Sequence, residues 1–158
     1  MENIIFRRIP NENDIQRIKE IVESTGFFYE YEVEVATDLL KEKLYEGIDY
    51  EFLFAEIDGI TVGYTCYSTI ECTISSYDLY WIVVDDKYRG KGIGKVLIEE
   101  TCKHIKELGG TNVYAETSGT DHYIPTQKFY LSNGFEMEAR IKDFYRKDDD
   151  KLIYTRHL

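Results

Sequence analysis

Proline and cysteine are scarce in this chain of 158 residues, and long apolar runs are missing. Two prolines and no serine-rich stretch leave nothing that resembles a linker, so we expect one domain over 1–158. Cys66, Cys72 and Cys102 form an odd set without a CxxC pair, which argues against a disulfide framework or a zinc site. No run approaches the length of a membrane span, and the N-terminus lacks a signal peptide's features. We therefore expect a cytoplasmic protein without a membrane partner.

Positive charge is also in short supply, because the formal net charge is -11. Such a chain repels a polyanionic duplex, and we find no concentrated basic face, so no nucleic-acid partner is expected. An amine or another cationic partner fits the charge better. The same acidity also serves solubility, so charge alone does not identify a partner.

The hydrophobic pattern predicts strands and helices in alternation. In the first half of the chain we expect a strand over 4–8, a helix capped by Asn13 and ended by Gly26, a helix over 34–45, and hairpin strands over 51–57 and 61–67 around Asp58-Gly59. A central strand over 79–84, covered on both faces, a helix over 93–108 and a strand over 112–116 should follow. The rest is predicted as a polar loop over 117–122, a helix from Pro125 to Asn133, and strands over 135–144 and 152–157 with Asp148–Asp150 in the turn. The strand, helix and strand between 79 and 116 form a βαβ unit, so those two strands should be parallel.

A basic, glycine-rich stretch, KYRGKGIGK over 87–95, lies between the central strand and the next helix. Glycines there let backbone N–H groups approach a ligand, and a helix N-terminus favours an anion, so phosphate is the expected guest. A P-loop would need four residues between its glycines and a hydroxyl after the lysine, yet Val96 follows Lys95. A dinucleotide fingerprint would need GxGxxG near the N-terminal strand, whereas Gly90, Gly92 and Gly94 are spaced GxGxG.

Arg89-Gly90-Lys91-Gly92-Ile93-Gly94 resembles the Arg/Gln-x-x-Gly-x-Gly/Ala signature of the GCN5-related N-acetyltransferases (GNAT). A second motif of that family, an aromatic helix ending in Gly-Phe, is similar to FYLSNGF over 129–135. With the order of elements, the resemblance covers nearly the whole chain. It implies the GNAT-like acyl-CoA N-acyltransferase fold, an α/β fold with a mixed sheet of about six to seven strands and about four helices.

The resemblance also implies a cofactor site for acetyl-CoA, with no metal. The pyrophosphate would be held by Arg89, Gly90, Lys91, Gly92, Ile93, Gly94 and Lys95, and the pantetheine arm would run along Ile82, Val83 and Val84. A backbone N–H near Val83 would stabilise the developing oxyanion. Tyr130 would contact the CoA sulfur and protonate the departing thiolate, although an aromatic on a short helix can equally belong to the core.

The base and the acceptor site are less determined. Asp78 lies just before the predicted central strand and Glu116 at the end of the next strand. Both should lie near the predicted cleft and are candidate bases, with water alone as an alternative. The acceptor pocket is expected from aromatic, acidic and loop positions, namely Phe28, Tyr29, Glu30, Tyr64, Tyr67, Thr117 and Tyr123. Aromatic faces beside carboxylates suit an ammonium group. His104, His122 and His157 lack ligand spacing.

These features favour an acetyltransferase that moves an acetyl group from acetyl-CoA to a primary amine of a small molecule. A protein or peptide N-terminus or a lysine is the alternative acceptor. Two other classes stay open: an acyl-CoA-binding sensor without turnover, and an ordinary nucleotide-binding domain. A homodimer is a further option, because family members often dimerise.

Overall fold

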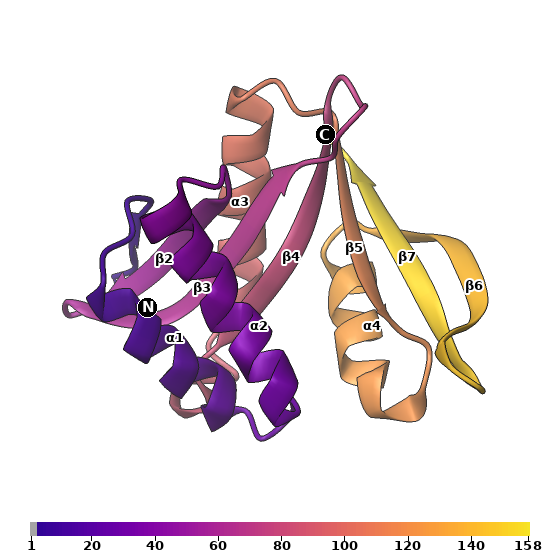
Figure 1. The fold of residues 1–158 in the computed structure, drawn as a ribbon, viewed down its shortest axis with the longest axis horizontal. Coiled ribbons are helices and arrows are strands. Elements are labelled where there is room, and N and C mark those ends of the chain that lie inside the picture. The colour runs from indigo at the N-terminus through magenta and orange to yellow at the C-terminus, as the bar shows by residue number, and fades with distance from the viewer. Residues whose placement is uncertain (1–2) are drawn as a thin grey trace. The chain divides into compact units, whose positions relative to one another are not determined.

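The computed structural model describes residues 3–158, which form one mixed seven-stranded sheet and four α-helices within that range (Figure 1). The strands are β1 (Ile5–Arg7), β2 (Glu51–Ile57), β3 (Ile60–Thr69), β4 (Ser76–Val84), β5 (Asn112–Ser118), β6 (Glu136–Arg146) and β7 (Asp149–His157). The helices are α1 (Asn13–Ser24), α2 (Glu30–Lys41), α3 (Ile93–Glu107) and α4 (Ile124–Ser132). The predicted order of elements and the GNAT-like fold are confirmed.

The sheet has the order β1-β2-β3-β4-β5-β7-β6, so β4 is its central strand, as predicted. β2 and β3 pair antiparallel around Asp58 (φ 50°) and Gly59 (φ 76°), both in the left-handed region that such a two-residue turn requires. β4 and β5 are parallel, and their ladder joins Ser76–Asp78 to Asn112–Tyr114. The remaining pairs, β5 with β7 and β7 with β6, are antiparallel.

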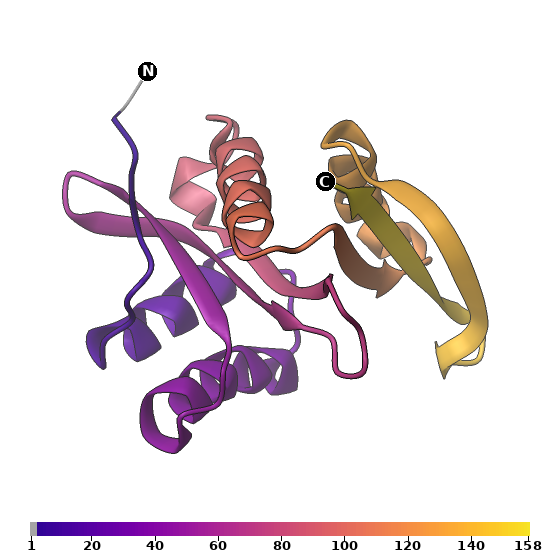
Figure 2. The ribbon, with the colours of Figure 1, turned by 90° about the horizontal axis from the view of Figure 1, so that it is seen from above.

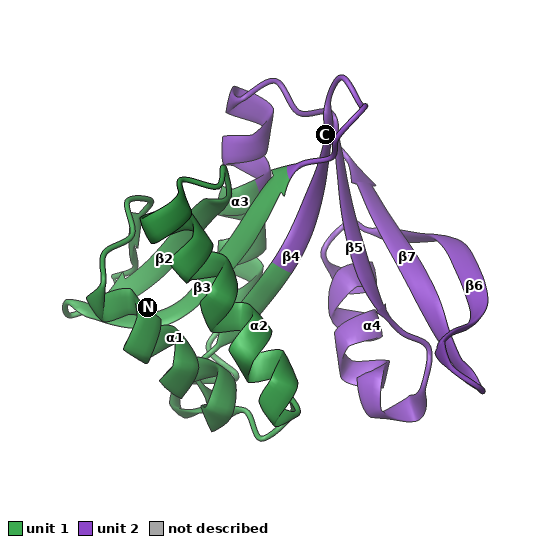
Figure 3. Ribbon diagram, viewed as in Figure 1, with its two compact units in different colours: residues 1–68, 81–101 green, residues 69–80, 102–158 purple. Residues whose placement is uncertain are grey.

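The chain divides into two compact units, which we describe separately (Figure 3). Unit 1 comprises the described residues up to Ser68 together with Trp81–Thr101. One face of its β2 and β3 packs Phe52, Phe54 and Tyr64 against α1 and α2, and these side chains are fully buried. α3 covers the other face, as Figure 2 shows, and there Thr65 and Thr101 share a buried 2.8 Å hydrogen bond.

Unit 2 comprises Thr69–Tyr80 and Cys102–Leu158. Its helix α4 packs on one face of β5 and β7, where Tyr130 stacks on Tyr154 with ring centroids 5.6 Å apart. The Gln127 side chain donates to the Ser118 carbonyl (3.0 Å) and so ties α4 to the end of β5. These contacts give unit 2 a core of its own.

The N-terminal helices differ from the sequence-based prediction. Asn13 is the first residue of α1 rather than its cap, and the Asn11 side chain instead accepts a hydrogen bond from the Asn13 N–H (2.9 Å). α2 begins at Glu30, four residues before the predicted 34, because the Glu32 side chain accepts a hydrogen bond from the Tyr29 N–H (3.1 Å) and caps the helix there. A π-helical turn over Glu42–Glu46 then leads to Gly47.

Strands also differ from the prediction in extent or burial, most clearly β4, β5 and β7. β4 begins at Ser76, and Tyr80 on it is 44% exposed, so the prediction that the strand is covered on both faces was wrong at that position. β5 continues to Ser118, which removes two residues from the predicted loop. β7 begins at Asp149, so only Asp148 of the acidic run stays in the turn, with φ of 63°.

A close approach inside unit 1 gives a test of this packing. A Cβ at Gly63 of β3 would lie 2.9 Å from the Val83 carbonyl oxygen and 3.0 Å from a methyl carbon of Leu97. Since a backbone atom cannot move cheaply, we expect Gly63→Ala to lower the free energy of unfolding by about 1–3 kcal/mol in denaturant titrations. Gly119→Ala is the control, because its Cβ would meet neighbours at an ordinary 3.5 Å. Equal stability of the two variants would contradict the packing.

Candidate active site

The glycine stretch predicted to bind phosphate forms a loop between β4 and α3 in unit 1. A 3-10 turn over Asp86–Tyr88 precedes it, and both Gly90 and Gly92 have φ of 76°, a conformation that side chains rarely adopt. The first helical bond of α3 runs from the Val96 N–H to the Gly92 carbonyl (3.2 Å). The N–H groups of the first turn after Gly92 therefore lack partners within the helix, which is the arrangement that favours an anion.

The cationic side chains of this loop are exposed. Arg89 pairs with Asp86 at 3.1 Å across an exposed i,i+3 spacing, and the Lys91 ammonium lies 5.5 Å from the centroid of the Tyr88 ring. Interactions of this kind between exposed groups contribute little free energy. Both side chains can therefore exchange these contacts for a bound anion at small cost.

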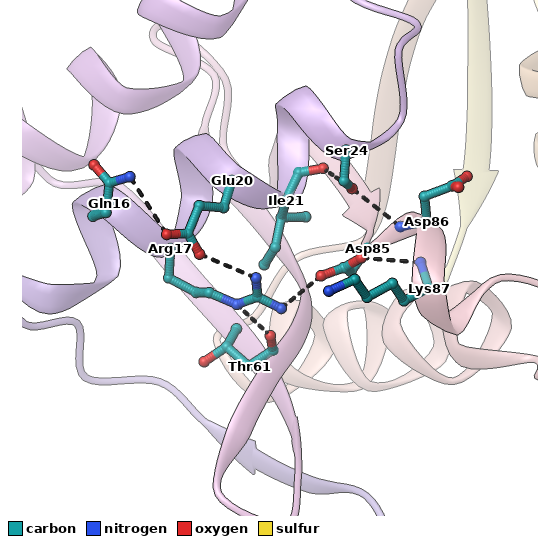
Figure 4. Close-up of polar contacts among 9 residues, drawn as sticks. All are labelled: Gln16, Arg17, Glu20, Ile21, Ser24, Thr61, Asp85, Asp86 and Lys87. Atoms are coloured by element: carbon teal, nitrogen blue, oxygen red, sulfur yellow. Dashed lines mark hydrogen bonds and ion pairs between the residues drawn. The ribbon is translucent and has the colours of Figure 1, made fainter.

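The base of the loop is held by a buried carboxylate, as Figure 4 shows. Asp85 is 3% exposed, and its side chain accepts hydrogen bonds from the Lys87 N–H (3.0 Å) and from Arg17 of α1 (2.7 Å). The Asp85 N–H donates to the Val62 carbonyl of β3 (2.8 Å). Sequence reasoning missed both residues. Aspartate is common at the start of a turn, so the sequence could have indicated a capping role for Asp85. No local pattern connects it to Arg17, which is 68 positions away in the chain.

The predicted pantetheine strand, Ile82–Val84, is the part of β4 that belongs to unit 1. Val83 is buried in the core cluster that α1 and α2 cover. Gly63 of β3 brings its backbone against the Val83 carbonyl and the Val84 Cα. The end of β4 is thereby fixed in unit 1 just before the loop begins.

Tyr130, the predicted general acid, lies on α4 in unit 2. It is 5% exposed, with its ring tilted against Phe135 (5.2 Å between centroids) and stacked on Tyr154. Burial raises the pKa of the Tyr130 hydroxyl. This group is therefore neutral and able to donate a proton over the whole physiological range.

Asp78 and Glu116, the predicted bases, lie on one face of the strands of unit 2. Asp78 pairs with Tyr114 in the parallel ladder, and Glu116 is two residues further along β5 on the same face. Lys151 of β7 joins them there and forms a 2.7 Å ion pair with Glu116. Burial raises the pKa of Asp78, the negative charge of Glu116 raises it further, and Lys151 partly offsets this.

Tyr130 lies on the opposite face of these strands. Its stacking partner Tyr154 pairs with Ala115 of β5, whereas Glu116 pairs with Ile153. Successive residues of a strand point to opposite faces, so Tyr130 and Glu116 are on different sides of β5 and β7. Within unit 2 the structure brings the two carboxylates and Lys151 together and leaves the tyrosine across the sheet. Lys151 was missed because its sequence neighbours carry no sign of the pairing.

The predicted acceptor residues of the N-terminal segment lie in unit 1. The Phe28 ring packs on Trp81 of β4 at 5.1 Å between centroids, and Tyr29 stacks on Tyr31 at 5.7 Å, both exposed. Glu30 is the exposed first residue of α2. Trp81, the single tryptophan of the chain, was not among the predicted site residues, although it immediately precedes Ile82.

The other predicted acceptor residues lie in three different surroundings. Tyr64 and Tyr67 are fully buried on β3, three residues apart and hence on opposite faces, and no hydrogen-bond partner is present for the Tyr64 hydroxyl among the described residues. Thr117 is buried near the end of β5, and Tyr123 ends a 3-10 turn before α4. The role of all of these residues stays a prediction.

Two general features of residues 3–158 complete the description. No group of three or more His, Cys, Asp or Glu side chains in this range is arranged to hold a metal ion. None of the helices in the same range combines the length and the apolar character needed to span a membrane.

Known proteins resemble the chain in sequence and fold. The family model described as Acetyltransferase (GNAT) domain matches residues 48–137. A solved structure from Desulfovibrio desulfuricans, assigned to the GNAT family of acetyltransferases, is 41% identical, covers 98% of this chain and 99% of its own, and superposes with a TM-score of 0.95. A search of curated proteins finds no match.

More distant structures share the fold alone. An aminoglycoside 6′-N-acetyltransferase in complex with coenzyme A is 15% identical, with 97% of this chain and 96% of its own covered and a TM-score of 0.77. The ribosomal-protein-alanine N-acetyltransferase from Brucella melitensis is 24% identical, with 98% and 99% covered and a TM-score of 0.75. The family model and the 41% identical structure together show that the chain belongs to the GNAT family of acetyltransferases and is an acyltransferase enzyme.

Proposed function

We propose that this enzyme moves an acetyl group from acetyl-CoA to a primary amine of a small molecule, by direct attack while both are bound. The observation that supports acetyl-CoA as the donor is the geometry of the loop before α3. Two glycines at φ of 76° and the first turn of a helix present N–H groups beside four exposed cations in an acidic chain. A diphosphate is the ligand that such a loop would hold most strongly.

The donor site would use the residues that the family resemblance assigns. The loop from Arg89 to Lys95 would bind the pyrophosphate, and Ile82–Val84 would line the pantetheine arm. Bound acetyl-CoA supplies an activated thioester carbonyl. A backbone N–H near Val83 would donate to the oxygen of that carbonyl as negative charge develops on it. Attack by a neutral amine then needs only orientation and proton transfer.

Asp78 is the better candidate of the two predicted bases. Glu116 is already engaged in a 2.7 Å ion pair with Lys151. Asp78 lies beside that pair, half-buried, and its raised pKa makes it the stronger proton acceptor. Asp78 would therefore accept a proton from the ammonium group of the acceptor, directly or through water, and so leave the neutral amine that attacks the thioester.

Tyr130 would act as the general acid. Its buried, neutral hydroxyl can donate a proton to the departing thiolate, and its ring is fixed between Phe135 and Tyr154, which limits its motion. A fixed donor loses little entropy when it reacts. Tyr130 is thus assigned to the sulfur of the donor and Asp78 to the nitrogen of the acceptor, two atoms that bond to the same carbonyl carbon during transfer.

Aromatic and acidic groups near α2 support a cationic acceptor. Aromatic ring faces and a carboxylate, both of which attract an ammonium group, occur in this segment. They belong to Phe28 packed on Trp81, to the stacked pair of Tyr29 and Tyr31, and to Glu30. The fold neighbours do not decide the acceptor class, since one is named for an aminoglycoside and another for ribosomal-protein alanine. A protein N-terminus or lysine remains the second candidate. A cytoplasmic location, a single domain and a homodimer stay predictions.

Donor binding can be tested by calorimetry with CoA, ATP and NAD. We expect CoA to bind at least tenfold more tightly than the other two. Gly92→Ala should weaken CoA binding by about tenfold, because a side chain at φ of 76° costs about 1–2 kcal/mol and moves the loop amides. Gly47→Ala, at φ of 69° with equally open surroundings, is the matched control and should leave CoA affinity unchanged. Tighter ATP binding would point to a nucleotide-binding domain.

The general acid can be tested by thiol release from acetyl-CoA with a panel of amines and amino acids. With an amine that accelerates release, we expect Tyr130→Phe to lower kcat by roughly 10²–10⁴-fold without changing CoA affinity. Tyr154→Phe, in the same ring stack, is the control and should retain activity. If CoA binds but no amine accelerates release and Tyr130→Phe changes nothing, the protein is a sensor instead of an acetyltransferase acting this way.

The environment of Asp78 can be tested through the pH dependence of stability. A raised pKa means that the folded state binds the Asp78 proton more tightly than the unfolded state does. The burial of Asp78 therefore costs stability as the pH rises above 3.8, the usual pKa of an aspartate. We expect Asp78→Asn to raise the free energy of unfolding at pH 7 relative to the native chain, and to have a smaller effect at pH 3.5.

The control for this comparison is Asp38→Asn on α2, an exposed carboxylate, which should show no such pH-dependent difference. The same Asp78→Asn variant should lower kcat/KM and remove the acidic limb of its pH profile. A pH-independent effect on stability together with unchanged kinetics would rule Asp78 out as the base.

A further inference from the structure

Arg17 of α1 makes three directed contacts at the base of the glycine loop (Figure 4). Its Nε–H donates to the Thr61 carbonyl of β3 (2.9 Å), and one Nη donates to the Asp85 carboxylate (2.7 Å). The other Nη contacts the exposed Glu20 side chain at 3.3 Å. The guanidinium therefore joins a helix, a strand and the start of the loop, with a planar fork that a lysine cannot reproduce.

Asp85 passes this restraint on to the loop. The oxygen that Arg17 does not contact accepts a hydrogen bond from the Lys87 N–H (3.0 Å), which closes the 3-10 turn, and the Asp85 carbonyl accepts another from the Tyr88 N–H (2.9 Å). Gly90 and Gly92 follow this turn directly. The position of the loop amides proposed to bind phosphate thus depends on a turn that is capped by a buried and paired residue, Asp85.

A second link from α1 acts on the same turn. The Ser24 hydroxyl donates to the Ile21 carbonyl (2.6 Å) and accepts a hydrogen bond from the Asp86 N–H (3.1 Å). Ser24 lies two helical turns after Arg17, so α1 holds the turn at two points. Neither residue belongs to the glycine motif itself.

Charge gives Arg17 a second effect. Asp85 lies immediately before a loop whose proposed ligand is an anion, and a buried carboxylate without a partner there would repel that ligand. Arg17 compensates this charge from outside the loop, and the loop cations stay exposed and available.

We propose that Arg17 is a positioning residue for the donor site: by holding Asp85 it orders the turn at Asp86–Tyr88 and the amides after it before acetyl-CoA binds. The inference rests on the proposed function of the loop. Preorganisation of this kind increases affinity because less conformational entropy is lost on binding.

The chain offers a matched control at the start of the same helix. Arg7 of β1 forms two hydrogen bonds to the Asp14 carboxylate of α1 (2.9 and 2.8 Å), and Asp14 is 4% exposed, close to the 3% of Asp85. Arg7→Met therefore removes the cation from an equally buried carboxylate that lies in the first turn of α1, whereas Asp85 directly precedes the turn before the glycine loop. A purely structural role for Arg17 predicts similar consequences for both variants.

The test compares Arg17→Met, Arg17→Lys and Arg7→Met by calorimetry with CoA, by KM for acetyl-CoA and for the amine, and by hydrogen exchange of the peptide covering 86–95. We expect Arg17→Met to raise the Kd for CoA and the KM for acetyl-CoA by about tenfold or more, to leave the KM of the amine within about twofold, and to speed exchange of the loop amides without any cofactor. Arg17→Lys should give a smaller loss, and Arg7→Met should leave the loop unchanged.

Equal effects of Arg17→Met and Arg7→Met, or none from either, would overturn the inference while leaving the proposed function intact. If the native chain does not bind CoA, the proposed function fails, and hydrogen exchange still decides whether Arg17 orders the loop. Should Arg17→Met fail to fold, Ser24→Ala replaces it, since it removes one hydrogen bond and should raise the Kd for CoA by about fivefold. An unchanged Kd in that variant would count against the inference.

Discussion

The buried carboxylate of Asp85 is the point on which the geometry of unit 1 near the loop depends. Its backbone N–H bonds to β3, its side chain bonds to α1 and closes the turn, and the glycine loop follows. A buried charge persists only when every part of its hydrogen-bonding capacity is met, and removing one partner costs ~3–5 kcal/mol. The requirement therefore fixes α1, β3 and the loop together. The conformation of the glycine loop is therefore constrained by contacts that lie outside the loop.

The chain separates its charges by function. The chain carries a net charge of -11, while the cations of 87–95 are exposed, and among them Arg89 pairs with the exposed Asp86. Exposed pairs can be exchanged with little loss of free energy, whereas the pair of Arg17 and Asp85 is held by burial. A buried ion pair thus shapes the loop, and an exposed, exchangeable one lies on it, which is the combination that the proposed anion site requires.

The fold and the donor motif could be predicted because their signals are local. The Asp58-Gly59 turn, the apolar stripe of α3 and the GxGxG spacing each depend on neighbours within a few positions, and the structure contains all three elements. The start of α2 was missed because a capping contact between Tyr29 and Glu32 outweighed the helical pattern. Arg17 and Lys151 could not be found locally, because their partners Asp85 and Glu116 are brought near only by strand and helix packing.

Two aspartates, Asp78 near the start of β4 and Asp85 directly after its end, show how a partner decides the electrostatics of the same kind of side chain. Asp85 faces a guanidinium, which stays charged at any physiological pH, and its oxygens are fully engaged in holding structure. Asp78 lies instead beside the ion pair of Glu116 and Lys151, and burial and the negative charge of Glu116 raise its pKa, which Lys151 only partly offsets. A carboxylate in this state is destabilised when it is charged. The placement of two cations therefore separates an aspartate that is held by its own ion pair from one that is not.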